Sequence, residues 1–180
     1  MDQMHIDLWV DGVNLLCDSG TYSYVGKLGT ELSSTIGHNT VKVGDMEQMK
    51  KIGAFMVYDW SKRGNFSFND YRFEGEMISV NGYKHRRIVE LKDSIIEIID
   101  EVDSTCRDWQ SVFHTPCKAV ESNDYVRLMD ENKELCLISG GEHTFKSTKR
   151  STHYMQSEQC TRIDFKNDGS SKIKITIKLS

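Results

Sequence analysis

The stretch Lys172–Leu179 reads KIKITIKL and sets the pattern that decides the fold. Isoleucine or leucine occupies every second position, and charged or hydroxyl residues stand between them. This is the pattern of a β-strand with one face buried. The turn residues Asn167-Asp168-Gly169 separate it from a second strand-like run, Thr161–Lys166. This end of the chain therefore predicts an antiparallel hairpin.

The same two-residue period runs through most of the chain. At the other end, Met4–Val10 alternates, and Asp11-Gly12 is typical of a tight hairpin turn that leads into Val13–Cys17. Further along, Lys92-Asp93 predicts a two-residue turn between two longer runs. The predicted strands between the two ends are Asn39–Val43, Ala54–Trp60, Asn65–Phe68, Phe73–Val80, Tyr83–Leu91, Ser94–Val102, Trp109–Thr115, Tyr125–Met129, Glu134–Ser139 and Glu142–Lys146.

About a dozen short strands at roughly 8–12-residue spacing predict an all-β fold, an antiparallel β-sandwich of two stacked sheets or a related barrel. The alternation argues against a parallel α/β sheet, whose strands would be buried on both faces. We expect a loop around Gly26–Gly29 and one helical turn within Asp45–Lys51. No change of composition marks a boundary, so residues 1–180 are predicted to form one domain.

Composition excludes several classes of function. The net charge of -4 gives no general attraction to nucleic acid or to an anionic membrane. No apolar run approaches the roughly 18 residues of a membrane-spanning helix. The five cysteines are an odd number without a CxxC pair, which favours buried free thiols over a disulfide framework or a zinc finger.

Two polar segments lie at predicted strand ends. Asp18 stands where a strand stops, beside Gly20, and could make an Asx turn or serve as a carboxylate ligand. His38 follows Gly37 and precedes a strand, so it could be a base, a metal ligand or a structural histidine. Asn39 beside it could orient His38 or bind a carboxylate.

A third polar segment alternates within a predicted strand. Tyr83, His85 and Arg87 share one face, and the two basic residues between them share the other. Arginine matches carboxylates or sulfates through paired donors, so this segment could bind an acidic ligand. The alternative is a set of internal salt bridges to the acidic residues at 74, 76 and 90. Phosphate-loop, GxSxG and HExxH motifs are absent from the sequence.

Six runs occur in a fixed order over nearly the whole chain: Asp2–Trp9, Leu16–Tyr24, Thr35–Val41, Gly82–Arg87, Ile98–Val102 and Phe113-His114. In this order they resemble the heparinase II/III-like family. Its members are polysaccharide lyases that act on uronic-acid polymers such as heparan sulfate or alginate, and they join an N-terminal α/α toroid to a C-terminal β-sandwich. The resemblance covers only the sandwich, so it implies that the toroid, with the catalytic base and acid, lies outside this chain.

The resemblance also implies roles for particular residues. The reaction is β-elimination, and the sandwich contributes a histidine to the cleft, which we assign to His38. Asn39, His85 and Arg87 are the predicted substrate-binding residues, and the implied partners are an acidic polysaccharide and the toroid. The isolated chain is expected to be inactive.

A metal site of the family's His…Asp…His type would use Asp18 and His38. It would hold zinc or another divalent cation. The first histidine is expected one position before Met1, which would leave the site incomplete in this chain, with His5 as a substitute.

Two other classes of function remain open. One is a non-catalytic carbohydrate-binding or structural sandwich in which Trp9, Trp60 or Trp109 stacks on sugar rings. The other is a metal-dependent barrel enzyme of the cupin type, which would need a complete set of ligands. A homodimer formed through an exposed apolar face is a further expectation. The family suggests a periplasmic or secreted protein.

Overall fold

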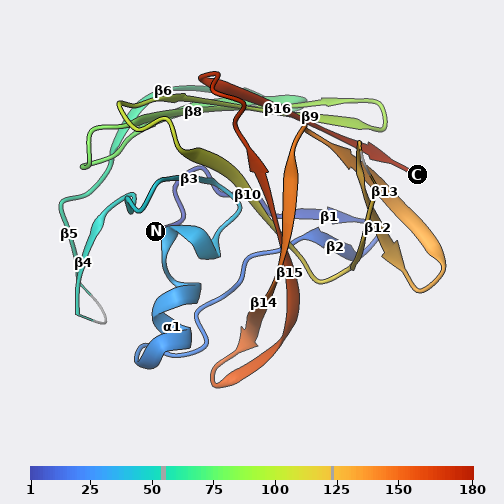
Figure 1. Cartoon of the computed structure of the whole chain (residues 1–180), viewed down its shortest axis with the longest axis horizontal. Helices are drawn as coiled ribbons and strands as arrows, with labels where there is room; N and C mark the ends of the chain where they lie inside the picture. The colour runs from blue at the N-terminus through green and yellow to red at the C-terminus, as the bar shows by residue number, and fades with distance from the viewer. Residues whose placement is uncertain (54–55, 123) are drawn as a thin grey trace.

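The computed structural model describes residues 1–53, 56–122 and 124–180, and all elements below lie within these ranges. They include one antiparallel eight-stranded sheet, with strand order β11-β12-β13-β16-β9-β8-β7-β6 (Figure 1). No helix among these residues is long and apolar enough to cross a membrane. The elements are β1 (Leu8–Val10), β2 (Val13–Leu16), α1 (Gly26–Leu32), the 3₁₀ turn η1 (Thr35–Gly37), β3 (Val41–Val43), β4 (Lys50–Ile52), β5 (Met56–Tyr58), β6 (Lys62–Asn69), β7 (Arg72–Ile78), β8 (Lys84–Lys92), β9 (Ile95–Asp103), β10 (Trp109–Thr115), β11 (Lys118–Glu121), β12 (Val126–Asp130), β13 (Lys133–Ser139), β14 (His143–His153), β15 (Gln156–Lys166) and β16 (Lys172–Leu179).

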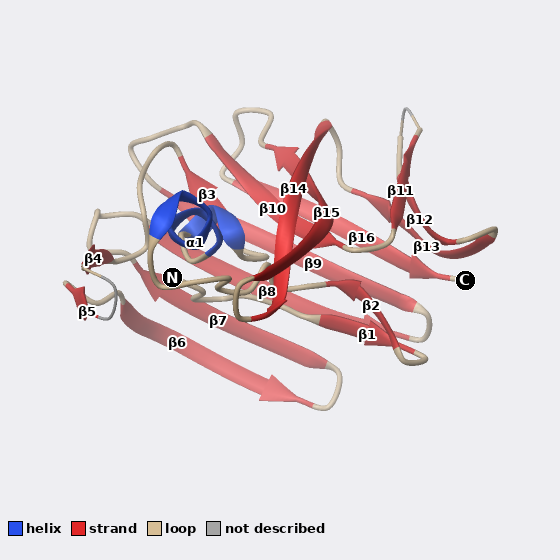
Figure 2. Ribbon diagram, turned by 90° about the horizontal axis from the view of Figure 1, so that it is seen from below, coloured by secondary structure: helices blue, strands red, loops and turns tan. Residues whose placement is uncertain are grey.

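A second layer packs against one face of the large sheet. It consists of a four-stranded sheet, β14-β15-β10-β3, and the β1–β2 hairpin beside it. Figure 2 shows α1 and the β14–β15 hairpin in front of the large sheet. Between the layers, Ile98 and Ile175 from the large sheet are fully buried, as are Phe113 and Phe165, whose rings meet edge to face at 6.0 Å. The prediction of an all-β sandwich of two stacked sheets is confirmed.

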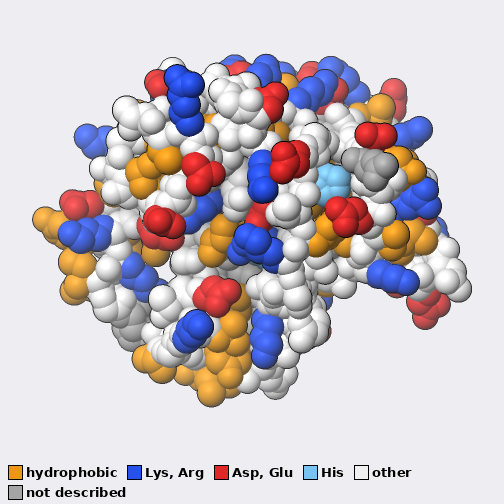
Figure 3. Space-filling view, in the orientation of Figure 1, with side chains coloured by type: hydrophobic (Ala, Val, Ile, Leu, Met, Phe, Trp, Pro, Cys, Tyr) orange, Lys and Arg blue, Asp and Glu red, His pale blue; other side chains and the backbone are white. Residues whose placement is uncertain are grey.

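The outer face of the large sheet is lined by salt bridges. Arg86 lies between Glu74 and Glu101, at 2.6 and 2.5 Å, and the Lys84 ammonium lies 2.7 Å from Glu76. Figure 3 shows basic and acidic side chains intermixed along this upper edge of the molecule and over the face in view. The predicted salt bridges to residues 74 and 76 are thus made by the outward-facing members of β8.

The inward face of β8 carries a different set of contacts. Arg87 donates from Nε and Nη2 to the two oxygens of Asp100 at 2.7 and 2.8 Å, and both side chains are completely buried. His85 lies 2.8 Å from Asp100 through Nε2, and Ser111 of the second layer donates to it at 2.6 Å. Burial alone would raise the pKa of Asp100, but the charge and hydrogen bonds of Arg87 hold it well below its ordinary value. A charged cluster therefore joins the two layers.

Two predictions of local structure were wrong. The segment expected to be a loop forms α1, which buries Gly29 and Leu32. Gly29 packs so closely on the preceding loop that a Cβ would lie 2.1 Å from the carbonyl oxygen of Ser23, so tertiary packing outweighs the low helix propensity of glycine. The segment 45–51 is not helical. Gly44, with φ +46, starts a tight turn there, and the chain then enters β4.

Several other predictions differ in their bounds. The β8–β9 turn is Asp93-Ser94, one residue later than expected, because Lys92 pairs with Ile95. Strands β14 and β15 are longer than predicted. Their hairpin extends from the body of the molecule (Figure 1), and its sequence lacks the alternation of apolar residues that predicted the other strands. Of the predicted strand Ala54–Trp60, residues 54–55 lie outside the described ranges, and β5 occupies Met56–Tyr58.

The two neighbouring arginines of β8 should differ sharply in their effect on stability. Arg87→Met leaves the buried Asp100 carboxylate without its partner, so the free energy of unfolding should fall by about 3–5 kcal/mol. Arg86→Met is the matched control on the outer face and should cost about 1 kcal/mol or less. Urea denaturation followed by circular dichroism measures both. Equal losses for the two variants would contradict this account of the core.

Candidate functional site

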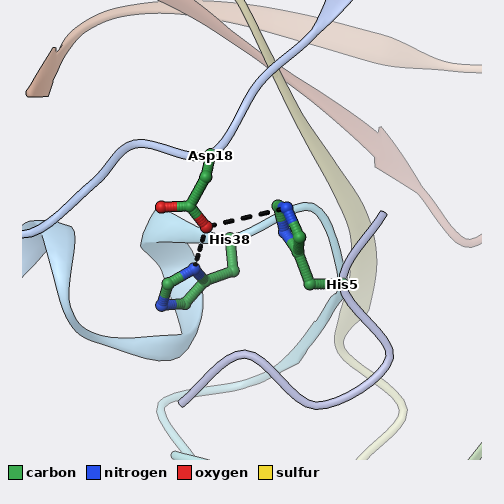
Figure 4. Close-up of side chains that lie close together, drawn as sticks. All are labelled: His5, Asp18 and His38. Atoms are coloured by element: carbon green, nitrogen blue, oxygen red, sulfur yellow. Dashed lines mark hydrogen bonds and ion pairs between the residues drawn. The ribbon is translucent and has the colours of Figure 1, made fainter. Parts of the chain in front are cut away.

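Three side chains that could bind a metal ion converge beside the β1–β2 hairpin (Figure 4). The Nδ1 atom of His38 lies 2.7 Å from Oδ2 of Asp18, and Nε2 of His5 lies 3.6 Å from the same oxygen. One candidate ligand atom from each residue falls within 4.8 Å of the other two. His38 is buried, and the other two are partly exposed.

Local backbone structure explains this convergence. His5 precedes β1 and Asp18 follows β2, so the hairpin brings them to the same end. Asp18 accepts a hydrogen bond from the backbone N–H of Gly20 at 2.6 Å, which is the Asx turn that the sequence predicted. Gly20 has φ +72, and a Cβ there would lie 2.0 Å from the carbonyl oxygen of Ser151 in the β14–β15 hairpin. His38 directly follows η1.

The electrostatics keep a negative charge in the cluster. Burial would raise the pKa of Asp18, but the hydrogen bond and charge of His38 outweigh burial and lower it. Burial also lowers the pKa of His5, against the opposing charge of Asp18. Because an ionised carboxylate only accepts, a neutral His38 carries its proton on Nδ1 and leaves Nε2 with a free lone pair. Figure 4 shows Nε2 on the side of the ring away from Asp18.

The second ring nitrogen of His5 also has a hydrogen-bond partner. Its Nδ1 accepts a hydrogen bond from the backbone N–H of Asn39 at 2.9 Å. A neutral His5 ring therefore carries its proton on Nε2, the atom that faces Asp18. Ligation of a cation by Nε2 would move that proton to Nδ1 and break the bond from Asn39.

The donor set nevertheless fits a divalent cation in type and grouping. Two imidazoles and one carboxylate are a set that zinc accepts, with room for water. The family resemblance placed the first histidine ligand one position before Met1 and left His5 as a substitute. The structure places His5 beside Asp18 and His38, so this chain supplies three donors by itself. The signal that could have found it is the hairpin, which predicts that residues flanking its strands meet.

The other predicted site residues are enclosed in the fold. Asn39, His85 and Arg87 have no exposed surface. The polar groups of Asn39 and Arg87 and the Nε2 atom of His85 bind other parts of the chain, whereas Nδ1 of His85 has no hydrogen-bond partner among the described residues. Substrate binding by these three residues stays a prediction. Of the other histidines, His114 is buried with its Nδ1 atom 3.2 Å from Oδ1 of Asn39, while His153 is exposed.

A groove leads to the cluster from outside. It has a volume of about 480 Å³ and is lined by residues 2–6 together with Phe73 and Val89 of the large sheet. Among these residues is His5, so one member of the cluster borders a space that a ligand can enter.

Comparison with known proteins settles the family. The family described as "Heparinase II/III-like, C-terminal" matches residues 1–178. The chain belongs to the heparinase II/III-like family. No curated protein matches it. The family resemblance inferred from the six sequence runs is confirmed.

Solved structures share the fold of this heparinase II/III-like chain. Heparan sulfate lyase HepC from Pedobacter heparinus has a TM-score of 0.76 at 14% identity over 98% of this chain. The heparinase III BT4657 gene product has a TM-score of 0.75 at 21% identity over 99%. The match spans only 30% of either structure, so both contain a large further region that this chain does not match.

The buried histidine behind the cluster should make stability depend on pH. Burial, assisted by the charge of Arg162, lowers the pKa of His114 to about 3, against about 6.5 in an unfolded chain. Between these values the unfolded state binds the extra proton, so stability is complete above pH 6.5 and falls as the pH decreases toward 3.

From pH 7 to pH 5 this residue should remove about 2 kcal/mol from the free energy of unfolding. His114→Gln should flatten that slope, and the exposed control His153→Gln should leave it unchanged. Urea midpoints at the two pH values measure the difference. An unchanged slope in His114→Gln would show that His114 is not the titrating group.

Proposed function

We propose that this chain is the C-terminal β-sandwich of a polysaccharide lyase that cleaves uronic-acid-containing glycans by β-elimination. The single observation that supports this most is the meeting of His5, Asp18 and His38 in a chain of this family, with His5 lining a groove. Heparan sulfate is the first substrate to test, because one solved relative is a heparan sulfate lyase. Alginate is the second. The remaining catalytic groups would come from the toroid domain.

In this reaction a base removes the proton next to the uronate carboxyl group, and an acid protonates the departing glycosidic oxygen. The proton becomes acidic only when the charge of the carboxyl group is neutralised. His38 can assist through Nε2, while Asp18 holds the opposite side of the ring. A proton taken up at Nε2 gives an imidazolium that the carboxylate stabilises. The 2.7 Å contact between the two side chains supports this role.

We also propose that zinc or another divalent cation binds to His5, Asp18 and His38. Such an ion, when bound, would supply positive charge near the uronate. Ligation through Nδ1 of His38 would place that ring's proton on Nε2, so cation binding and proton uptake by Nε2 exclude each other. The two roles of His38 are therefore distinguishable by experiment.

The exposed tryptophans support a second candidate, a carbohydrate-binding module without catalysis. Trp9 and Trp60 are 63% and 66% exposed, which leaves their rings open to stack on sugars. Trp109 is 3% exposed and belongs to the core. Formation of a homodimer through an exposed apolar face stays a prediction.

Catalysis should depend on His38 in the protein that joins this chain to its toroid. His38→Ala should lower kcat/KM on heparan sulfate by roughly 100-fold or more, because a positioned proton-transfer group contributes about that much. The ultraviolet absorbance of the unsaturated uronate product measures the rate. His153→Ala, an exposed histidine elsewhere, is the control. Undiminished activity in His38→Ala would remove His38 from the mechanism. Glycan binding without cleavage by the parent protein would favour the second candidate.

Cation binding should be measurable on this chain alone. Calorimetric titration with zinc should give one site per chain, with affinity at least 10-fold weaker in His38→Ala and in Asp18→Asn. Zinc at 100 times its Kd should raise the free energy of unfolding by about 2.7 kcal/mol. Asp7→Asn, a carboxylate outside the cluster, serves as control. Absence of saturable binding by the unaltered chain would leave the proton-transfer role and end the cation proposal.

A further inference from the structure

The amide of Asn39 contacts every segment that carries a member of the cluster. Its Nδ2 donates to the carbonyl oxygen of Ile6, next to His5, at 2.8 Å, and to that of Cys17, next to Asp18, at 3.1 Å. Asn39 itself follows His38 in sequence. These bonds join three segments of the chain whose bonded residues are 11 or more positions apart.

The remaining polar atoms of Asn39 are also used. Oδ1 accepts from the backbone N–H of His114 on β10 at 2.7 Å, and the backbone N–H of Asn39 donates to Nδ1 of His5 at 2.9 Å. The side chain has no exposed surface. Both amide hydrogens and the amide oxygen are thus satisfied inside the protein, and none is free for a substrate.

Arg87 fixes the same region from the large sheet. Its Nη1 atom donates to the carbonyl oxygens of Met4 and Asn39, at 2.6 and 2.5 Å, while the rest of its guanidinium binds Asp100. Met4 has φ +65, a left-handed conformation that is costly for a residue other than glycine. The bond from Arg87 holds this strained residue directly before His5.

We propose that Asn39 is the positioning residue of the His5–Asp18–His38 cluster, with Arg87 fixing Asn39 from behind. Asn39 holds the hairpin ends and the His38 segment at one separation, and its backbone amide turns Nε2 of His5 toward Asp18. An asparagine is required because two donors and one acceptor must act from one short side chain. The inference rests on the proposed function for its chemistry but concerns an arrangement that can be measured without substrate or cation.

The test uses Asn39→Ser, which is neutral but too small to reach both carbonyls, and Asn39→Asp, which keeps the shape and loses both donors. Asn167 provides the matched control. Its Nδ2 also donates to two backbone carbonyls, of Arg107 and Ser170, although it is only partly buried and lies outside the cluster. The same two substitutions at Asn167 remove the same kind of bond.

Two measurements are made on each protein. The ¹⁵N chemical shifts of the histidine rings, in the absence of metal, report which nitrogens of His5 and His38 carry protons. Titration with cobalt(II), followed by its visible absorption, reports binding by the cluster. Both Asn39 variants should shift the ring signals of His5 and His38 and weaken cobalt binding at least 10-fold. The Asn167 variants should leave the ring signals unchanged and the cobalt affinity within twofold.

Other results are equally decisive. Asn39 variants that lose thermal stability but keep the ring signals and the cobalt affinity would show a merely structural residue and overturn the proposal. If the unaltered chain binds no cobalt, the cation role fails, and the ring signals alone decide the role of Asn39. If neither Asn39 variant folds, hydrogen exchange of the Asn39 side-chain amide in the unaltered protein decides. Strong protection supports the bonds described, and exchange as fast as that of an exposed amide overturns them.

Discussion

The buried pairing of Arg87 with Asp100 is the constraint on which the rest of the structure depends. It joins β8 to β9 in the large sheet, accepts Ser111 from the second layer and extends to the backbone beside the candidate site. Such a pair adds little net stability over an apolar replacement, because both charges lose their hydration. Each remaining donor must then find an acceptor, which restricts how the two layers and the N-terminal segment can fit together. We regard this pair as a source of specificity of packing.

Period-two alternation was enough to predict the fold class and even the facing of individual residues. On β8 it separated Arg86, which lies among acidic residues on the outer face, from Arg87, which lies in the core. The Asx turn at Asp18 was also readable, because a short acidic side chain before a glycine carries a local mechanism. Local chemistry and pleat direction are properties of neighbouring residues, and a sequence displays them directly.

Partners distant in sequence were not readable in this way. Alternation turns Arg87 inward but does not say that Asp100 rather than another acid will meet it, since this depends on the β8–β9 register, which differed by one residue from the expected turn. His5 was expected only as a substitute ligand, because its place beside Asp18 depends on the left-handed Met4 and on the hairpin closing beside η1. Nor does the sequence show that the Asn39 amide binds three backbone groups, because the same chemistry would serve glycan hydroxyls, and its contact with substrate stays a prediction.

The close approach of Gly20 to Ser151 links the evolution of two distant parts of the chain. Any side chain at position 20 would meet the carbonyl oxygen of the β14–β15 hairpin at 2.0 Å. Relatives that retain a long hairpin should therefore keep glycine here, and relatives that have shortened it lose this clash, although φ +72 still favours glycine. A larger residue at position 20 of a homologous domain would therefore indicate that the β14–β15 hairpin no longer lies against the loop after β2.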